Sequence, residues 1–280
     1  PRRPILRGRM GLNGNRLALS FTEDGEPAQE IMGILEALAK RRKYFRLKDG
    51  SFLDLSDMDE WQELADSVYE AATREGIDKV CPNGDTISLR SYRTCYLNSL
   101  LENCHLPVEV ERSVQDTIAA LSAPEEGDIQ LPQGLTLRPY QQRGFAWLKT
   151  LARLGMGGVL ADDMGLGKTI QVLALIQWGY ETQGCMPSLV VAPTSLVYNW
   201  QAEIQKFTPH MRTVVLSGGK DDRRKQAEDI EKVDVLIASY AQIRRDIEWL
   251  EQISFRFCIL DEAQQIKNAA SVGAGAWREV

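Results

Sequence analysis

The spacing of hydrophobic residues changes near residue 130 and divides the sequence into two predicted domains, 1–130 and 131–280. In the first domain most apolar residues recur at helical spacing, and two alternating runs flank an Asp-Gly pair in residues 44–55. These runs predict a β-hairpin, because Asp-Gly favours the tight turn that joins two strands. Helices are expected at 27–43, from Met58 to Val68, within 92–103 and within 108–121. The first domain is therefore expected to be mainly helical, with one hairpin.

Three local features complete this domain. Ser56 and Asp59 precede the second helix and are expected to cap its start. Residues 1–16 are rich in Arg and Gly, and nothing in them forces a particular fold. Residues 122–128 have the composition of a linker, which places the domain boundary near residue 130.

Apolar runs of strand length alternate with helical patterns throughout the second domain. Strands are expected at 158–161, 188–192, 213–216, 234–238 and 255–260. Helices are expected at 138–154, 169–180, 196–207, 223–231 and 240–250. This alternation predicts an α/β fold in which a parallel sheet carries helices on both faces.

A glycine-containing loop follows the first of these strands and leads into a helix. It ends in Gly165, Leu166, Gly167, Lys168 and Thr169. Glycines let successive backbone N–H groups face phosphate oxygens at the positive end of the following helix. In such a loop the lysine reaches the β- and γ-phosphates and the threonine ligates Mg²⁺, so the sequence predicts a nucleoside triphosphate site. The strict pattern has Gly where this chain has Asp162, but the surrounding strand, loop and helix have the required order.

Two carboxylates follow the last predicted strand. Asp261 and Glu262 come directly after the apolar run 257–260, at the edge of an α/β sheet where ligands bind. Asp261 is placed to hold Mg²⁺ through its water shell, and Glu262 to orient and deprotonate an attacking water. With the phosphate loop upstream, this pair indicates an ATPase.

Hydrophobic content, cysteine spacing and charge argue against several classes of protein. The chain has 44% hydrophobic residues but no apolar run long enough to cross a bilayer and no signal peptide. Its five cysteines show no metal-site spacing and no disulfide framework, which favours a reducing cytoplasm. The net charge is −6, which argues against coating nucleic acid by bulk electrostatics. The charge is unevenly spread: residues 1–50 carry 11 basic and 6 acidic side chains, and residues 51–130 carry 5 and 17.

The ordered motifs of the second domain resemble the Swi/Snf-type ATPases, the chromatin-remodeller branch of superfamily-two helicases. The resemblance rests on 137–148, the phosphate loop, 189–200 and 260–268, and it covers residues 135–280. It implies a RecA-like lobe. In this family the first residue of the phosphate loop is Asp, as at Asp162. The resemblance also implies that Gln141 hydrogen-bonds to the adenine of ATP, since an amide both donates and accepts. The resemblance places Gln264 beside Glu262, Lys168 and Asp261 in the catalytic set, and Gln264 in place of His points to bacterial members.

The family resemblance also has implications for binding partners. The resemblance implies that Thr194, Ser195, Ser239 and Tyr240 touch the phosphate backbone of double-stranded DNA, a task suited to small hydroxyls and backbone N–H groups. The hairpin at 44–55 is similar to a helicase-associated segment of bacterial relatives. We expect a monomer in the bacterial cytoplasm, associated with the nucleoid and with no membrane contact. The first domain is also expected to make a protein or intramolecular contact.

The two ends of the sequence affect how much ATP hydrolysis we expect from this chain. It starts without Met, as expected for a chain that begins inside a longer protein, and it stops before the family's Thr-Gly-Thr-Pro motif and second lobe. Arginine fingers of that lobe contribute on the order of 10³–10⁵ in rate. We therefore expect this chain to bind ATP and Mg²⁺ but to hydrolyse ATP negligibly by itself.

The leading interpretation is an ATP-dependent translocase on double-stranded DNA, and three alternatives to it stay open. The first is an RNA helicase or other nucleic-acid-stimulated ATPase that shares the same lobe. A nucleotide-gated interaction module is a different class, in which the acidic stretch mimics DNA and holds the motor inactive. Direct DNA binding by an N-terminal tail is a weaker alternative, resting on Arg2, Arg3, Arg7 and Arg9.

Overall fold

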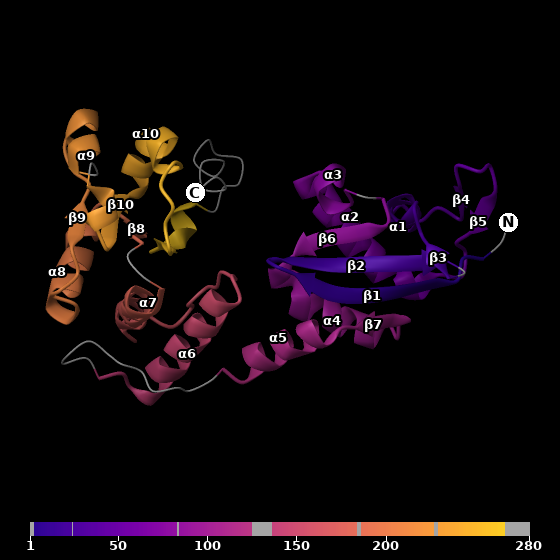
Figure 1. The fold of residues 1–280 in the computed structure, drawn as a ribbon, viewed down its shortest axis with the longest axis horizontal. Helices are drawn as coiled ribbons and strands as arrows, with labels where there is room; N and C mark the ends of the chain where they lie inside the picture. The colour runs from indigo at the N-terminus through magenta and orange to yellow at the C-terminus, as the bar shows by residue number, and fades with distance from the viewer. Residues whose placement is uncertain are drawn as a thin grey trace. The chain divides into compact units, whose positions relative to one another are not determined.

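A computed structural model of the chain describes residues 3–23, 25–82, 84–124, 136–183, 186–226 and 229–266. These residues form two compact units, and Figure 1 labels most of their helices and strands. The first unit contains the described residues up to 124 together with 150–158, and the second contains 136–149 and 159–266. The predicted domain boundary near residue 130 lies outside the described residues.

The first unit contains a five-stranded sheet that the sequence analysis did not predict. Its strands are β1 (Leu6–Asn13), β2 (Arg16–Glu23), β3 (Glu26–Pro27), β6 (Thr86–Arg90) and β7 (Val108–Val110). The order is β3-β2-β1-β7, with β6 also paired to β2, and all pairs are antiparallel except β1 with β7. The expectation of a mainly helical domain is therefore incomplete.

Local sequence explains the β1–β2 hairpin. Asn13 pairs with Arg16 across the two-residue turn Gly14-Asn15, and Gly14 has a φ of +57°. Leu17, Leu19 and Phe21 on β2 are buried at alternate positions, as expected for a strand with one face on the core. The Gly-Asn turn and this alternation were the signals that could have predicted the strands.

The hairpin and the four predicted helices of the first unit are confirmed, with different bounds, and the short helix at Ile77–Val80 was not predicted. The helices are α1 (Ile31–Ala39), α2 (Gln62–Glu75), α3 (Ile77–Val80), α4 (Thr94–Asn103) and α5 (Arg112–Ser122). The hairpin consists of β4 (Tyr44–Arg46) and β5 (Phe52–Asp54). The predicted cap is wrong: α2 starts at Gln62 without a side-chain cap, and the Ser56 N–H donates to the Asp54 carboxylate at 3.0 Å.

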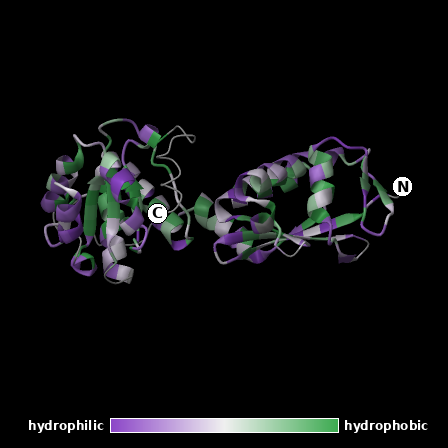
Figure 2. Ribbon diagram, turned by 90° about the horizontal axis from the view of Figure 1, so that it is seen from above, coloured by the Kyte–Doolittle hydropathy of each residue, from purple (hydrophilic) through white to green (hydrophobic). Residues whose placement is uncertain are grey.

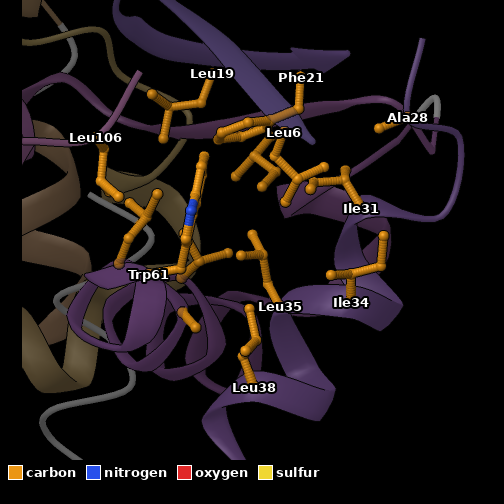
Figure 3. Close-up of a cluster of buried hydrophobic side chains, with 14 of the residues drawn as sticks. Leu6, Leu19, Phe21, Ala28, Ile31, Ile34, Leu35, Leu38, Trp61 and Leu106 are labelled. Atoms are coloured by element: carbon orange, nitrogen blue, oxygen red, sulfur yellow. The ribbon is translucent and has the colours of Figure 1, made fainter. Parts of the chain in front are cut away.

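A single hydrophobic core fills the first unit. Figure 3 shows Leu6, Leu19 and Phe21 of the sheet and Ile31 and Leu35 of α1 pointing into one cluster with Trp61. The rings of Phe21 and Trp61 pack edge to face with centroids 5.9 Å apart. The sheet and the helices are therefore held together by one apolar cluster.

The second unit contains a four-stranded parallel sheet. Its strands are β8 (Ser188–Ala192), β9 (Thr213–Val215), β10 (Val235–Ser239) and β11 (Cys258–Leu260), in the order β11-β8-β10-β9. Its helices are α6 (Pro139–Arg153), of which residues 139–149 belong to this unit, and α7 (Lys168–Gln183), α8 (Val197–Phe207), α9 (Lys220–Gln226) and α10 (Tyr240–Leu250). The predicted α/β class and parallel sheet are confirmed.

Alternate residues of the central strands face opposite layers of helices. Val190 and Ile237 pack in a cluster with α7 and α8, whereas Leu189 and Leu236 pack in a second cluster with α10. The two central strands, β8 and β10, are buried along their whole length, and Figure 2 colours them as mainly hydrophobic. Helices therefore cover both faces, as the continuous apolar runs predicted.

Two expected elements of this unit differ from the structure. Residues 158–161 form no strand, and Val159 is 82% exposed, so the short apolar run ahead of the phosphate loop lacks a pairing partner within the described residues. The helix expected at 223–231 starts earlier, at Lys220, where the Asp222 carboxylate accepts the Gly219 N–H at 3.1 Å.

Among the helices that the structure describes, none is long and apolar enough to cross a membrane.

Candidate nucleotide site

The phosphate loop enters α7 at the residue that the motif requires. Lys168 is the first residue of α7, and Gly165 and Gly167 in the loop ahead of it have φ angles of +84° and +78°. L-amino acids with side chains rarely adopt these angles. A Cβ on Gly167 would lie 2.5 Å from Nε2 of Gln141, whereas the space beside Gly165 is open. Both glycines are therefore needed, and one side of the loop is free to receive a ligand.

The Lys168 side chain folds back on its own loop. Its ammonium donates to the main-chain carbonyls of Asp162 at 2.7 Å and Asp163 at 3.1 Å. Carbonyl oxygens carry only partial negative charge, and the phosphates of a nucleotide are much stronger partners for an ammonium group. The lysine is thus already at the loop, next to the first turn of α7, and the N–H groups at the start of a helix have no partner within the helix itself.

Asp162, the departure from the strict motif, has a structural partner. Its carboxylate accepts a hydrogen bond of 2.9 Å from the amide of Gln171, which is fully buried in the second turn of α7. Sequence reasoning missed Gln171, because a glutamine inside an apolar helix gives no signal of its own. The bond ties the start of the loop to the helix that follows it.

Gln141, the predicted adenine reader, lies against the same loop. Its amide N–H₂ donates to the Leu166 carbonyl at 2.9 Å, and its amide oxygen accepts the Arg138 N–H at 2.9 Å. The hydroxyl of Tyr140 donates to the same Leu166 carbonyl at 3.0 Å. The structure therefore brings Gln141 to the nucleotide loop, with both ends of its amide engaged within the chain.

Asp261 is held at the end of β11 by the strand beside it and by two helices. Its N–H donates to the Val191 carbonyl at 2.8 Å, which continues the pairing of β11 with β8. The indole N–H of Trp200 on α8 donates to Oδ2 of its carboxylate at 2.9 Å. The hydroxyl of Tyr240 on α10 donates to its carbonyl at 2.7 Å. Burial raises the pKa of Tyr240 to about 12, so its phenol keeps the donated proton at neutral pH.

Glu262 and Gln264 follow in a tight turn. Glu262 has a φ of +53°, which a residue with a side chain rarely adopts, and a 3₁₀ turn at Ala263–Ile266 comes directly after it. The amide of Gln264 donates to the Glu262 carboxylate. The turn therefore gives Glu262 a defined neighbour at the edge of the sheet. Residues 267 and 268 of this motif lie outside the described residues.

The four predicted DNA contacts differ in exposure. Thr194 and Ser195 are exposed in the loop between β8 and α8. Ser239 and Tyr240 are buried, and the Ser239 hydroxyl accepts the Gln242 N–H in a capping box at the start of α10. Ser239 and Tyr240 thus have structural partners, whereas Thr194 and Ser195 are the exposed members of the four.

The side chains present fit a magnesium ion carried by a nucleotide. In the described part of the chain no three His, Cys, Asp or Glu side chains gather into a metal site. Mg²⁺ in nucleotide sites needs only one or two protein oxygens, because phosphates and water supply the rest. Thr169 and Asp261 offer a hydroxyl and a carboxylate of the required kind. Within the described residues, no hydrogen bond or ion pair joins the loop to Asp261.

These features define a phosphate-loop protein of the RecA-like α/β class. A glycine loop enters a helix at a lysine, and an acidic pair ends a parallel strand of the same unit. Comparison with known proteins then gives the family: the chain belongs to the SNF2 family, since the model of the SNF2-related domain matches residues 140–279. The model named bacterial SNF2 helicase associated matches residues 2–132. The bacterial Swi/Snf-type resemblance is thereby confirmed.

Individual relatives agree with this assignment. An uncharacterized ATP-dependent helicase of Mycoplasma genitalium is 40% identical over 51% of this chain and 14% of its own length. The putative ATP-dependent helicase/translocase YwqA of Bacillus subtilis is 41% identical over 52% of this chain and 16% of its own length. The Sulfolobus solfataricus SWI2/SNF2 ATPase core in complex with dsDNA matches with a TM-score of 0.51 and 36% identity, over 56% of this chain and 32% of that chain. The chain therefore spans less than a fifth of the two curated relatives.

Proposed function

We propose that this chain binds Mg²⁺-ATP and forms the first motor lobe of an ATP-dependent translocase on double-stranded DNA. One observation carries the proposal: Lys168 is the first residue of α7, after a loop with two glycines at positive φ, and its ammonium already lies at that loop. Loops of this form hold phosphates with backbone N–H groups and a lysine.

Each side chain of the site has a proposed role. Lys168 and the first-turn N–H groups of α7 hold the triphosphate, and Gln141 contacts the adenine after exchanging its bond to Leu166. Thr169 and Asp261 hold Mg²⁺, which when bound neutralises negative charge on the phosphates. Glu262, kept in place by Gln264, orients the attacking water and accepts its proton.

The DNA part of the proposal rests on position and on relatives. Thr194 and Ser195 are exposed directly after β8, at the same sheet edge as Asp261. One similar solved structure is an ATPase core in complex with dsDNA, and one curated relative is a putative helicase/translocase. We also propose a bacterial cytoplasmic protein that works on the nucleoid as a monomer.

Nucleotide binding by the chain tests the site. Titration with a fluorescent ATP analogue and Mg²⁺ should show saturable binding that Lys168→Ala weakens at least about 100-fold, because hydrogen bonds to charged groups are strong and several are lost. Lys220→Ala is the matched control, because Lys220 also starts a helix after a glycine turn and lies outside the site. Unchanged binding by Lys168→Ala would overturn the site assignment.

Nucleic-acid stimulation of the whole protein tests the substrate. ATPase activity should rise with duplex DNA and not with RNA, and equal stimulation by both would favour the RNA helicase alternative. The 280-residue chain alone should show negligible turnover with or without DNA, because the site described here includes no arginine finger. Turnover by this chain that depends on Lys168 would contradict that part.

A second candidate function concerns the first unit. Residues 51–130 carry 17 acidic and 5 basic side chains, and most of the acidic ones in the described part are exposed. A dense negative surface can occupy a groove meant for DNA. Deleting residues 1–130 from the whole protein should then raise basal ATPase activity and DNA affinity. An unchanged basal rate would remove autoinhibition from consideration.

A further inference from the structure

Asp261 receives hydrogen bonds from two helices that flank opposite faces of the sheet. Trp200 lies on α8, in the cluster with Val190 and Ile237, and Tyr240 lies on α10, in the cluster with Leu189 and Leu236. The indole of Trp200 reaches the carboxylate at 2.9 Å, and the phenol of Tyr240 reaches the main-chain carbonyl at 2.7 Å. The side chain and the backbone of one acidic residue are thus fixed separately.

The bond from Trp200 selects one carboxylate oxygen. Oδ2 accepts the indole N–H, and no described residue donates to Oδ1. Trp200 is 5% exposed and belongs to the core of its unit, so its ring has little freedom to move. A carboxylate held in this way keeps one oxygen free and pointed in a fixed direction.

We propose that Trp200 and Tyr240 are positioning residues that orient Asp261 for the metal ion of the nucleotide. The proposal rests on the proposed function, because it assigns these two residues to the same site. Groups that hydrogen-bond to a metal ligand set its orientation, and removing them typically lowers metal affinity about 10- to 100-fold. Packing alone does not require the indole N–H, since a phenylalanine ring fills most of the same space.

The experiment separates positioning from packing by measuring the dependence of nucleotide binding on Mg²⁺. The 280-residue chain is titrated with a fluorescent ATP analogue in EDTA and then with increasing Mg²⁺. Trp200→Phe should raise the Mg²⁺ concentration at half-maximal effect about tenfold, and leave the affinity in EDTA unchanged. Tyr240→Phe removes only the hydroxyl and should shift the Mg²⁺ dependence in the same direction.

A matched control is available in the same unit. Trp249→Phe also removes a buried indole N–H, but that group has no hydrogen-bond partner in the described residues and lies outside the site. It should leave the Mg²⁺ dependence unchanged. If Trp200→Phe does not fold, as judged by circular dichroism and thermal unfolding, Tyr240→Phe decides the question.

The outcomes distinguish this inference from the proposed function. If the unmodified chain binds no nucleotide with Mg²⁺ present, the proposed function fails. If the unmodified chain binds and responds to Mg²⁺, but Trp200→Phe and Tyr240→Phe respond identically to it, the inference alone is overturned. An equal loss of affinity in EDTA and in Mg²⁺ would also overturn it, since that result indicates a general packing defect.

Discussion

The amide of Gln171 and the carboxylate of Asp162 are joined by a hydrogen bond of 2.9 Å between α7 and the start of the phosphate loop. Gln171 is fully buried, and a Cβ on Gly144 of α6 would lie 1.9 Å from its amide oxygen. The glutamine therefore fits between α6 and the loop only because residue 144 has no side chain. Asp162 supplies the partner for its amide N–H₂, which gives the unusual first residue of the loop a physical reason.

Replacing Asp162 should destabilise the second unit through this bond. Asp162→Ala leaves a buried amide without its acceptor, a change that costs about 1–3 kcal/mol. Thermal unfolding should show a transition several degrees lower than in the unmodified chain. Asp163→Ala is the control, since its exposed side chain makes no hydrogen bond within the described residues, and it should change stability by less than about 0.5 kcal/mol. Equal effects of both substitutions would contradict the role of the Gln171 bond.

Loss of a buried ion pair should also lower the free energy of unfolding of the second unit. Arg223 of α9 makes a two-pronged contact with Asp246 of α10, and it also donates to the Gly218 carbonyl at 2.6 Å. The bond to Asp246 raises the pKa of Arg223 above its ordinary value, so the guanidinium of Arg223 stays charged. Arg223→Ala leaves the Asp246 carboxylate buried without its partner, and it should cost about 3–5 kcal/mol in urea unfolding.

The neighbouring Arg224 provides the comparison. Its side chain is exposed, so Arg224→Ala should change the free energy of unfolding by less than about 0.5 kcal/mol. The double substitution Arg223→Met with Asp246→Leu should recover much of the stability, because an apolar pair removes the unpaired charge. Recovery would show that the loss comes from an uncompensated carboxylate.

Patterns local in sequence predicted much of the fold and the phosphate loop. The parallel strands of the second unit read as continuous apolar runs, and Lys168 begins α7 where the glycine loop required it. Such features depend on neighbouring residues only. The five-stranded sheet of the first unit was not predicted, although its Gly14-Asn15 turn and the alternating burial of β2 are local signals.

Features that depend on distant residues could not be predicted. Trp200 and Asp261 are 61 positions apart, and no sequence pattern shows that an indole will meet that carboxylate. The strand predicted at residues 158–161 is not present in the structure. An apolar run has the composition of a strand, but it becomes one only where a partner strand lies beside it. Pairing and side-chain contact across the sheet are properties of the fold.

Two cysteines of the first unit should differ sharply in reactivity. Burial raises the pKa of the Cys81 thiol, whereas Cys95 is exposed on α4. Only the thiolate attacks alkylating reagents, so at pH 8 Cys95 should react with iodoacetamide at least about tenfold faster than Cys81. Peptide mass spectrometry of the folded chain measures both rates. The difference should disappear in urea, where both thiols are in water; a difference that persists there would exclude burial as its cause.

The exposed loop after β8 should contribute to DNA affinity without contributing charge. Thr194 and Ser195 offer hydroxyls at the surface, and hydroxyls that bind phosphates release no counterions. Thr194→Ala with Ser195→Ala should therefore weaken duplex DNA binding by the whole protein about 3- to 30-fold, and leave the slope of affinity against salt unchanged. Thr182→Ala, whose exposed hydroxyl instead donates to the Trp178 carbonyl on α7, should leave the affinity unchanged. A reduced salt slope in the double variant would mean that the substitutions disturb basic contacts elsewhere, and unchanged affinity would remove this loop from the DNA interface.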